Sequence, residues 1–365
     1  MKKIILILLL LPWFSCACYA QDVGEETASI TGAMQVEDGL GEEEREVVGD
    51  LTLDGSYDGR GALSRLWTRL VDSVRAHLAE ELRFAVSLLA IAFFCSLSSA
   101  FIQNPRFTEF MELAACCAAA LLLAGSMNTV IAQAAETLTR LSDYGKLALP
   151  AFFTTVAACG SAVSASVKYA AVCFVTEIFM SLSQKLILPM IYAFLAASIC
   201  SSLFENALLK TVVRLCKWCA ITAMTLMTSA FCLYISLSGA ISGSADALAV
   251  KTTKSVIASA LPVVGGILSD SAAAMLSAAG LIKNSAGVFC LIAVCALCAG
   301  PFALLAVKML VFKLSSALSE LAGSGRYSRL LDNMGTSFGM LLGMVGSYGT
   351  MLFFSIMSGI KMVHV

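Results

Sequence analysis

Long runs of residues without a charged side chain dominate the sequence from residue 84 onward and limit what it can fold into. Seven such runs have between 19 and 28 residues, and about 20 apolar residues are enough for a helix that crosses a bilayer. These runs are Phe84–Gln103, Leu113–Ala135, Leu147–Val167, Leu186–Phe204, Trp218–Ala245, Asn284–Val307 and Asn333–Ile360. Two similar stretches contain one acidic residue each, Tyr169–Gln184 and Ser255–Ile282. We therefore expect an all-α polytopic membrane protein with seven to nine membrane segments, some of them broken or re-entrant.

The composition agrees with a membrane protein, and its charge is unevenly distributed. Hydrophobic residues make up 59% of the chain and charged residues only 13%, whereas soluble domains have roughly 25% charged residues. Residues 21–60 carry a net charge of −10, from twelve acidic residues and two arginines. The remainder is mildly basic and shows no concentrated basic patch, so we expect no nucleic-acid partner.

The chain divides into four predicted regions. Residues 1–20 have the positive start, apolar core and small-residue end of a signal peptide, with an uncleaved anchor as the alternative. Residues 21–60 are predicted to be an acidic, disordered extracytoplasmic segment. Residues 61–83 show a helical apolar spacing and form either an amphipathic helix on the membrane or a partner, or a simple extension of the first span. Residues 84–365 form the membrane domain, and residues 21–82 are expected outside the cytoplasm.

An internal repeat of 112 residues is plausible within the membrane domain, covering residues 138–245 and 250–357. Pro150 and Pro262 are 112 residues apart, and so are Pro189 and Pro301. Transporters often contain such repeats. The basic stretches 210–217 and 308–329 should both face the cytoplasm, whereas an inverted repeat would place them on opposite sides. The orientation of the repeat therefore stays open.

A broken apolar segment at residues 260–270 is the strongest candidate for a working part. Pro262 removes a backbone donor, Gly265 and Gly266 weaken the helix that follows, and Asp270 adds an acid. Irregular backbone at membrane depth is tolerated only inside protein or beside water. The alternative is a kinked structural helix in which Asp270 caps the next helix.

Other ionisable residues in or beside apolar runs are candidates for a transport path, because such groups usually face a bundle interior or water. The alternative is that they mark water-facing turns. They are Asp246, Lys251, Lys254, Lys283, Lys168, Glu177, Lys185 and Lys308. The chain has two histidines and neither a nucleotide-binding loop nor a nucleophile motif, so we expect neither an enzyme nor a cofactor. The fourteen cysteines are expected to pack as small apolar residues and not to bind metal.

The order and spacing of one set of residues resemble the stage III sporulation protein AE family. This set comprises Asp246, Lys251, Lys254, Pro262, Gly265, Gly266, Asp270, Lys283, Asn284, Gly287 and Pro301. The resemblance brings no catalytic residues, so these positions are carried over only as motif residues.

The resemblance implies a permease-like component of a channel or secretion complex in the mother-cell membrane facing the forespore. Its implied partners are other stage III A proteins, including a cytoplasmic ATPase and exported ring-forming proteins, and indirectly the forespore stage II protein Q. The implied role is endospore formation and late forespore gene expression. The competing hypotheses are a stand-alone secondary transporter of a small solute and a structural anchor.

Overall fold

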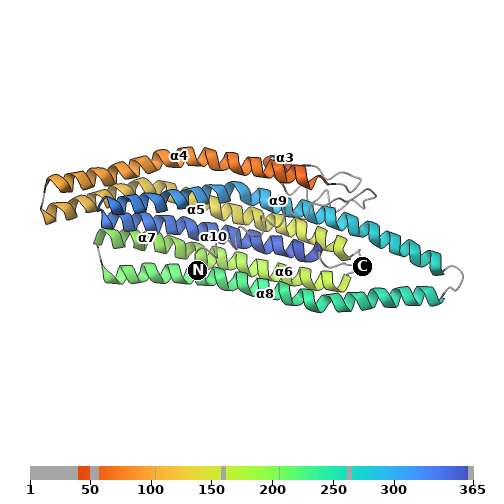
Figure 1. The fold of residues 1–365 in the computed structure, drawn as a ribbon. Helices are drawn as coiled ribbons and strands as arrows, with labels where there is room; N and C mark the ends of the chain where they lie inside the picture. The colour runs from red at the N-terminus through yellow and green to blue at the C-terminus, as the bar shows by residue number, and fades with distance from the viewer. Residues whose placement is uncertain are drawn as a thin grey trace.

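The computed structural model describes residues 40–49, 57–102, 104–157, 162–204, 206–260 and 265–360, with the backbone alone for residues 236–283. All regular structure in these ranges is helical, which confirms the predicted all-α class. Long helices pack side by side into an elongated bundle (Figure 1). The helices are α3 (Glu42–Val48), α4 (Gly59–Phe101), α5 (Pro105–Val156), α6 (Ala162–Leu182), a π-helix (Ser183–Ile187), α7 (Leu188–Phe204), α8 (Ala207–Ala260), α9 (Gly265–Leu321) and α10 (Gly325–Ile360).

The chain runs up and down the bundle, so its connections gather at two ends. The connections α4–α5, α7–α8 and α9–α10 lie at one end, on the left of Figure 1. We call this the basic end, because Arg106, Lys210, Arg214 and Arg329 lie close to these connections. The basic stretches 210–217 and 308–329 therefore lie on the same side. This arrangement satisfies the positive-inside rule for both stretches.

Within the described ranges, five helices are long and apolar enough to cross a membrane, and a sixth span is counted if the bent pair Arg106–Leu123 and Gly125–Val156 forms one. This number is below the seven to nine expected. Apolar runs that the sequence separates lie on shared helices: α5 carries Leu113–Ala135 together with the start of Leu147–Val167. One 40-residue candidate span likewise covers Ala165–Phe204. A few charged residues on a helix therefore need not mark a turn.

The helices are much longer than a bilayer requires. Helices α8 and α9 have 54 and 57 residues, which corresponds to about 80 Å at 1.5 Å per residue. The hydrocarbon core of a bilayer is about 30 Å thick. More than half of each helix would therefore lie outside the hydrocarbon if the bundle stood upright.

Residues 61–83 continue into the first span without a break, as one helix of 43 residues. The buried face of this helix contains Ala62, Leu66, Ala85 and Leu88. Trp67, by contrast, is 67% exposed. The apolar spacing of this region is thus divided between a buried and an exposed face of one continuous helix.

Part of the acidic segment is ordered, which differs from the disorder expected for residues 21–60. Helix α3 packs against α4 and α9, and its Val47 and Val48 are buried. Arg69 forms an ion pair with Glu43 at 2.6 Å, and Arg65 Nε donates to the Val47 carbonyl at 3.1 Å. Two buried valines of α3 and two arginines of α4 thus keep α3 in place, although its acidic composition alone suggests disorder.

A π-helical turn at Ser183–Ile187 precedes Pro189. Proline has no N–H for the carbonyl four residues earlier, and its ring crowds that carbonyl. A widened turn accommodates both effects, and single π-turns inside α-helices are the usual form of this feature. The chain therefore continues from α6 into α7 without a loop.

Glycines allow the most extensive helix contact in the bundle, that between α9 and α10. A Cβ atom at Gly335 would lie 3.3 Å from the backbone nitrogen of Lys313, and one at Gly349 would lie 2.9 Å from Cys298 Sγ. Cys298 is buried and is a free thiol. Small residues at such positions let two backbones approach closely in a membrane.

We expect Gly349→Val to destabilise the protein by about 1–3 kcal/mol, because the added methyl groups overlap α9. Gly125→Val is the matched control, since nothing lies within 4 Å of a Cβ atom at Gly125 and the change in helix propensity is the same. Thermal unfolding in detergent compares the two variants. Equal midpoints would show that α9 and α10 do not approach as closely as described.

Candidate functional site

The residues of the predicted broken segment lie on the last part of α8 and the first part of α9. Asp246, Lys251 and Lys254 are on α8, and Gly265, Gly266, Asp270 and Lys283 are on α9. Pro262 lies outside the described residues. Helix α8 runs away from the basic end and α9 runs back toward it, and these two helices extend farthest from the basic end (Figure 1).

The last three motif residues lie within the well-packed part of α9. Pro301 and Asn284 are both half-buried. Gly287 is placed against two other helices: a Cβ atom there would lie 2.5 Å from Ile360 Cγ1 and 3.1 Å from the ring of Phe152. A Cβ atom at Gly359 would also overlap the Phe152 ring, at 2.4 Å. The Phe152 ring therefore packs against Gly287 and Gly359, where a larger residue would not fit, so Gly287 has a packing role.

A buried ion pair joins α4 to α9. Lys308 Nζ donates to Glu81 Oε1, and the two side chains are only 13% and 10% exposed. The Lys308 ammonium group also lies 5.9 Å from the centre of the Phe338 ring on α10. The second carboxylate oxygen of Glu81 has no hydrogen-bond partner among the described residues. Lys308 thus links three helices in a largely apolar setting.

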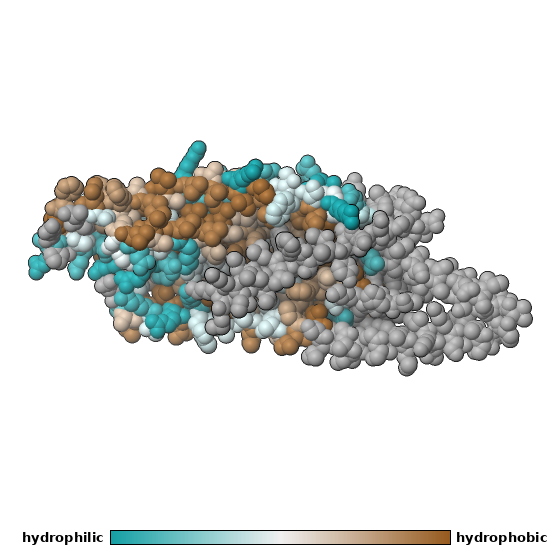
Figure 2. All heavy atoms as spheres, in the orientation of Figure 1, coloured by the Kyte–Doolittle hydropathy of each residue, from teal (hydrophilic) through white to brown (hydrophobic). Residues whose placement is uncertain are grey.

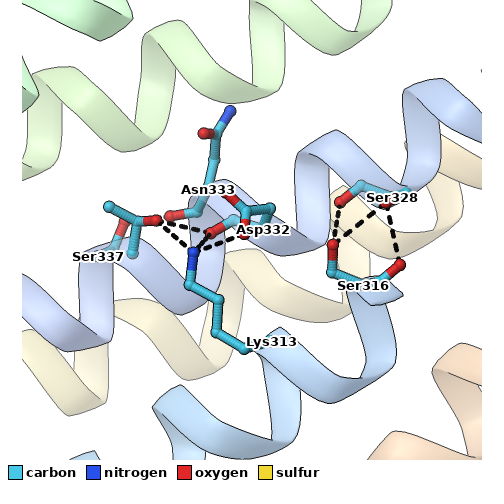
Figure 3. Close-up of polar contacts among 7 residues, drawn as sticks. Lys313, Ser316, Ser328, Asp332, Asn333 and Ser337 are labelled. Carbon is cyan, nitrogen blue, oxygen red and sulfur yellow. Dashed lines mark hydrogen bonds and ion pairs between the residues drawn. The ribbon is translucent and has the colours of Figure 1, made fainter. Parts of the chain in front are cut away.

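A second network joins α9 to α10 closer to the basic end (Figure 3). Lys313 Nζ lies 2.5 Å from Asp332 Oδ1 and donates to the Asp332 carbonyl at 3.1 Å and to Thr336 Oγ1 at 2.8 Å. One turn away, Ser316 and Ser328 exchange hydrogen bonds with each other's carbonyl oxygens at 2.9 and 3.0 Å. These contacts fix the register of the two helices.

Helices α4 and α5 are tied to the start of α10 in the same region. Arg326 Nε lies 3.8 Å from Glu112 Oε2 on α5, with both side chains mostly buried. Tyr327 donates its hydroxyl hydrogen to the Leu88 carbonyl on α4 at 2.8 Å. Four helices are thus joined through charged and polar groups in the half of the bundle nearest the basic end.

This arrangement of paired charges and hydroxyl groups supports the packing of the helices around it. Its members are paired carboxylates, ammonium and guanidinium groups and hydroxyls. Within the parts of the chain that the structure describes, no group of three or more His, Cys, Asp or Glu residues could hold a metal ion. Removing one partner of a buried pair leaves an uncompensated charge, so these contacts make the position of α9 depend on α4 and α10.

The other predicted ionisable residues have different surroundings. Lys168 is buried and donates to Ser358 Oγ at 2.9 Å. Glu177 is exposed and lies 3.8 Å from Lys146 Nζ. Lys185 is part of the π-helical turn. The structure therefore does not bring these three residues together with the network around Lys308.

Sequence reasoning selected Lys308 but missed its partner Glu81, as well as Lys313 and Asp332. The spacing contained a usable signal for Glu81, which lies four residues before Ala85 and seven before Leu88, both buried. An acid on the apolar face of a helix needs a cation. Its position 227 residues before Lys308 hides the pairing in the sequence.

Comparisons with known proteins give one consistent result. The family model described as stage III sporulation protein AE matches residues 50–362. The chain is similar to the stage III sporulation protein AE of Bacillus subtilis (strain 168), with 25% identity over 240 residues. That alignment covers 65% of this chain and 59% of the relative, so the chain matches about three-fifths of the relative's length. No solved structure matches.

We expect Lys308→Met to lower the free energy of unfolding by about 3–5 kcal/mol, because Glu81 would keep a buried, unpaired charge. Adding Glu81→Met should recover most of this loss. Lys146→Met is the control, since Lys146 and Glu177 form an exposed pair at 3.8 Å, which should contribute less than about 1 kcal/mol. Denaturant unfolding in detergent measures all four proteins. A double variant no more stable than Lys308→Met would contradict the proposed role of the pair.

Proposed function

The chain belongs to the stage III sporulation protein AE family and so acts in sporulation, and we propose that it is the permease-like membrane component of a channel or secretion complex between mother cell and forespore. The complex would be needed for endospore formation and late forespore gene expression. The observation that carries the proposal is the extent of the family match, which spans residues 50–362. It covers α4 to α10 as one unit, so the family's role attaches to the whole helical bundle.

The distribution of charge supports a defined orientation for this component. The basic end would face the mother-cell cytoplasm, in line with the positive-inside rule. Residues 21–82, including α3, would then lie outside the cytoplasm, between the two membranes. The acidic residues of α3, Glu42, Glu43, Glu44 and Glu46, suit an aqueous setting.

The proposed partners are those that the family resemblance implies, and the orientation suggests which end of the bundle each would approach. Its sequence has no phosphate-binding loop, so energy from a nucleotide would come from a separate ATPase. That ATPase would approach the basic end from the cytoplasm. Exported ring-forming stage III A proteins would approach the opposite end, and the forespore stage II protein Q would be reached through them.

Purification of a tagged chain from cells entering sporulation, in mild detergent, tests this assignment. We expect the ATPase and at least one exported stage III A protein to be recovered with it, identified by mass spectrometry. A tagged, unrelated multi-span protein from the same membrane is the control. Recovery as a lone monomer or homodimer, under conditions that preserve other membrane complexes, would favour the solitary secondary transporter instead.

The motif acid Asp270 provides a second test. We expect Asp270→Asn to reduce the number of heat-resistant spores while the complex still assembles, because Asp270 is one of the motif positions whose order and spacing carry the family resemblance. Asp143→Asn, which also neutralises an acid but on the exposed face of α5, is the control. Normal sporulation with Asp270→Asn would remove this residue from the mechanism and favour the structural-anchor hypothesis.

A further inference from the structure

Contacts with α10 show which residues of α4 and α8 lie at the same height along the bundle. The Phe84 ring of α4 lies 6.0 Å from the Phe312 ring of α9, and Phe312 faces Gly335 of α10. Met224 of α8 faces Gly343 of α10, two turns farther from the basic end. The height of Phe84 therefore corresponds to a position about two turns before Met224 on α8.

Between this height and the basic end, the outer surface of α4 is apolar, whereas that of α8 carries exposed basic residues among exposed apolar ones such as Leu208 and Leu215. Five large side chains of α4 are between 46% and 80% exposed: Val86, Phe93, Phe94, Leu97 and Phe101. On α8, Lys210 and Arg214 are exposed. Figure 2 shows the apolar surface along α4 near the basic end and its change to a hydrophilic surface toward α3.

On the other side of this height, exposed charged residues lie on α4 and the surface of α8 is free of charge. Helix α4 exposes Asp72, Arg75 and Glu80. The outer face of α5 is also polar and exposed, with Gln133, Glu136, Arg140, Asp143 and Lys146 on it, and Gly145 next to this face packs against Leu352 of α10. Helix α8 has no charged residue from Trp218 to Ala245, and it exposes Leu226 and Leu233 by 65% and 63%.

If the bundle stood upright, one bilayer could not cover the apolar faces of both α4 and α8. A slab placed around Leu226 would put Arg75, Glu136 and Asp143 in hydrocarbon, and a slab placed around Phe94 would include Lys210 and leave the apolar face of α8 in water. Charged side chains at the bilayer centre cost several kcal/mol each. The apolar faces of α4 and α8 are offset by roughly 25–30 Å along the axis, at 1.5 Å per residue.

We propose that the lipid-facing belt crosses the bundle obliquely, from the Val86–Phe101 face of α4 to the Trp218–Leu233 face of α8, so that the bundle lies tilted in the membrane. Helix pairs pack about 8–10 Å apart, so an offset of this size across a bundle of three to four helices corresponds to a tilt of roughly 45°. The hydrocarbon core of the bilayer would cover this belt.

The helix lengths and the exposed charged residues fit the same placement. A helix of about 80 Å tilted by 45° extends about 57 Å along the membrane normal, which is nearer than the 80 Å of an upright helix to the 40–45 Å of a bilayer with its headgroup regions. The acidic helix α3 and the polar face of α5 then lie in water on one side, and Lys210 and Arg214 lie in water on the other. The Glu81–Lys308 pair lies one to two turns beyond the Val86 end of this belt, buried between α4 and α9.

Cysteine labelling in native membranes tests the tilt with two pairs of exposed positions, the members of each pair lying within about one helical turn of the same height. The first pair is Arg75→Cys on α4 and Leu226→Cys on α8. The second is Phe94→Cys on α4 and Lys210→Cys on α8. A charged, water-soluble maleimide and a lipid-soluble maleimide are applied separately, and the modified peptide is identified by mass spectrometry, so native cysteines do not interfere.

We expect the water-soluble reagent to modify the cysteines at positions 75 and 210, and the lipid-soluble reagent alone to modify those at 94 and 226. Labelling after denaturation confirms that each cysteine is reactive. An upright bundle predicts that both members of one pair face water, so water-soluble labelling at either position 94 or position 226 would overturn the proposal. Protection of position 75 from the water-soluble reagent would overturn it as well.

Discussion

The close approach of α9 and α10 is the contact on which the rest of the bundle depends. Glycines on α10 bring its backbone against Phe312 and Lys313 of α9. At this distance Lys313 reaches both Asp332 and Thr336, and Ser316 and Ser328 exchange hydrogen bonds. Any larger side chain at Gly335 would separate these groups, so the polar pairs in this region depend on the close packing of the two helices.

The other helices are added to this pair through contacts of two kinds. Aromatic rings fill spaces that glycines leave, as Phe152 does between Gly287 and Gly359. Charged groups also connect the helices, because apolar contacts alone do not specify which residues must meet. Glu81 pairs with Lys308, and Glu112 pairs with Arg326. A buried pair does not by itself guarantee stability, but it penalises any arrangement that separates its partners. The bundle is thus specified by charge as well as by shape.

The sequence predicts the helical class and the membrane character well, because both depend on local properties, namely the length and apolarity of runs such as Asn333–Ile360. It predicts connections less well. The charged residues Glu136 to Lys146 suggest a boundary between two spans, yet they lie on the outer face of one continuous helix. Periodicity shows that α4 has two faces but not which one is buried, since that depends on α9, far away in the sequence.

The candidate site shows the same limit. Lys308 stands out as a cation in an apolar run, but its partner on α4 and the ring of Phe338 are brought to it only by the fold. The role of Gly287 also depends on a distant residue, Ile360. Motif order identifies the family, whereas the function of each motif residue depends on neighbours that sequence spacing does not contain.

The distance along the chain between Glu81 and Lys308, 227 residues, has a consequence for biosynthesis. Chains are made at about 5–20 residues per second, so the cation reaches the acid roughly 10–45 s after Glu81 has left the ribosome. Until then α4 carries an acid whose partner cation has not been made, and α3 lacks the surface of α9 against which it packs. Helix α4 is therefore made long before it can take its final place, and its packing is completed only when α9 arrives.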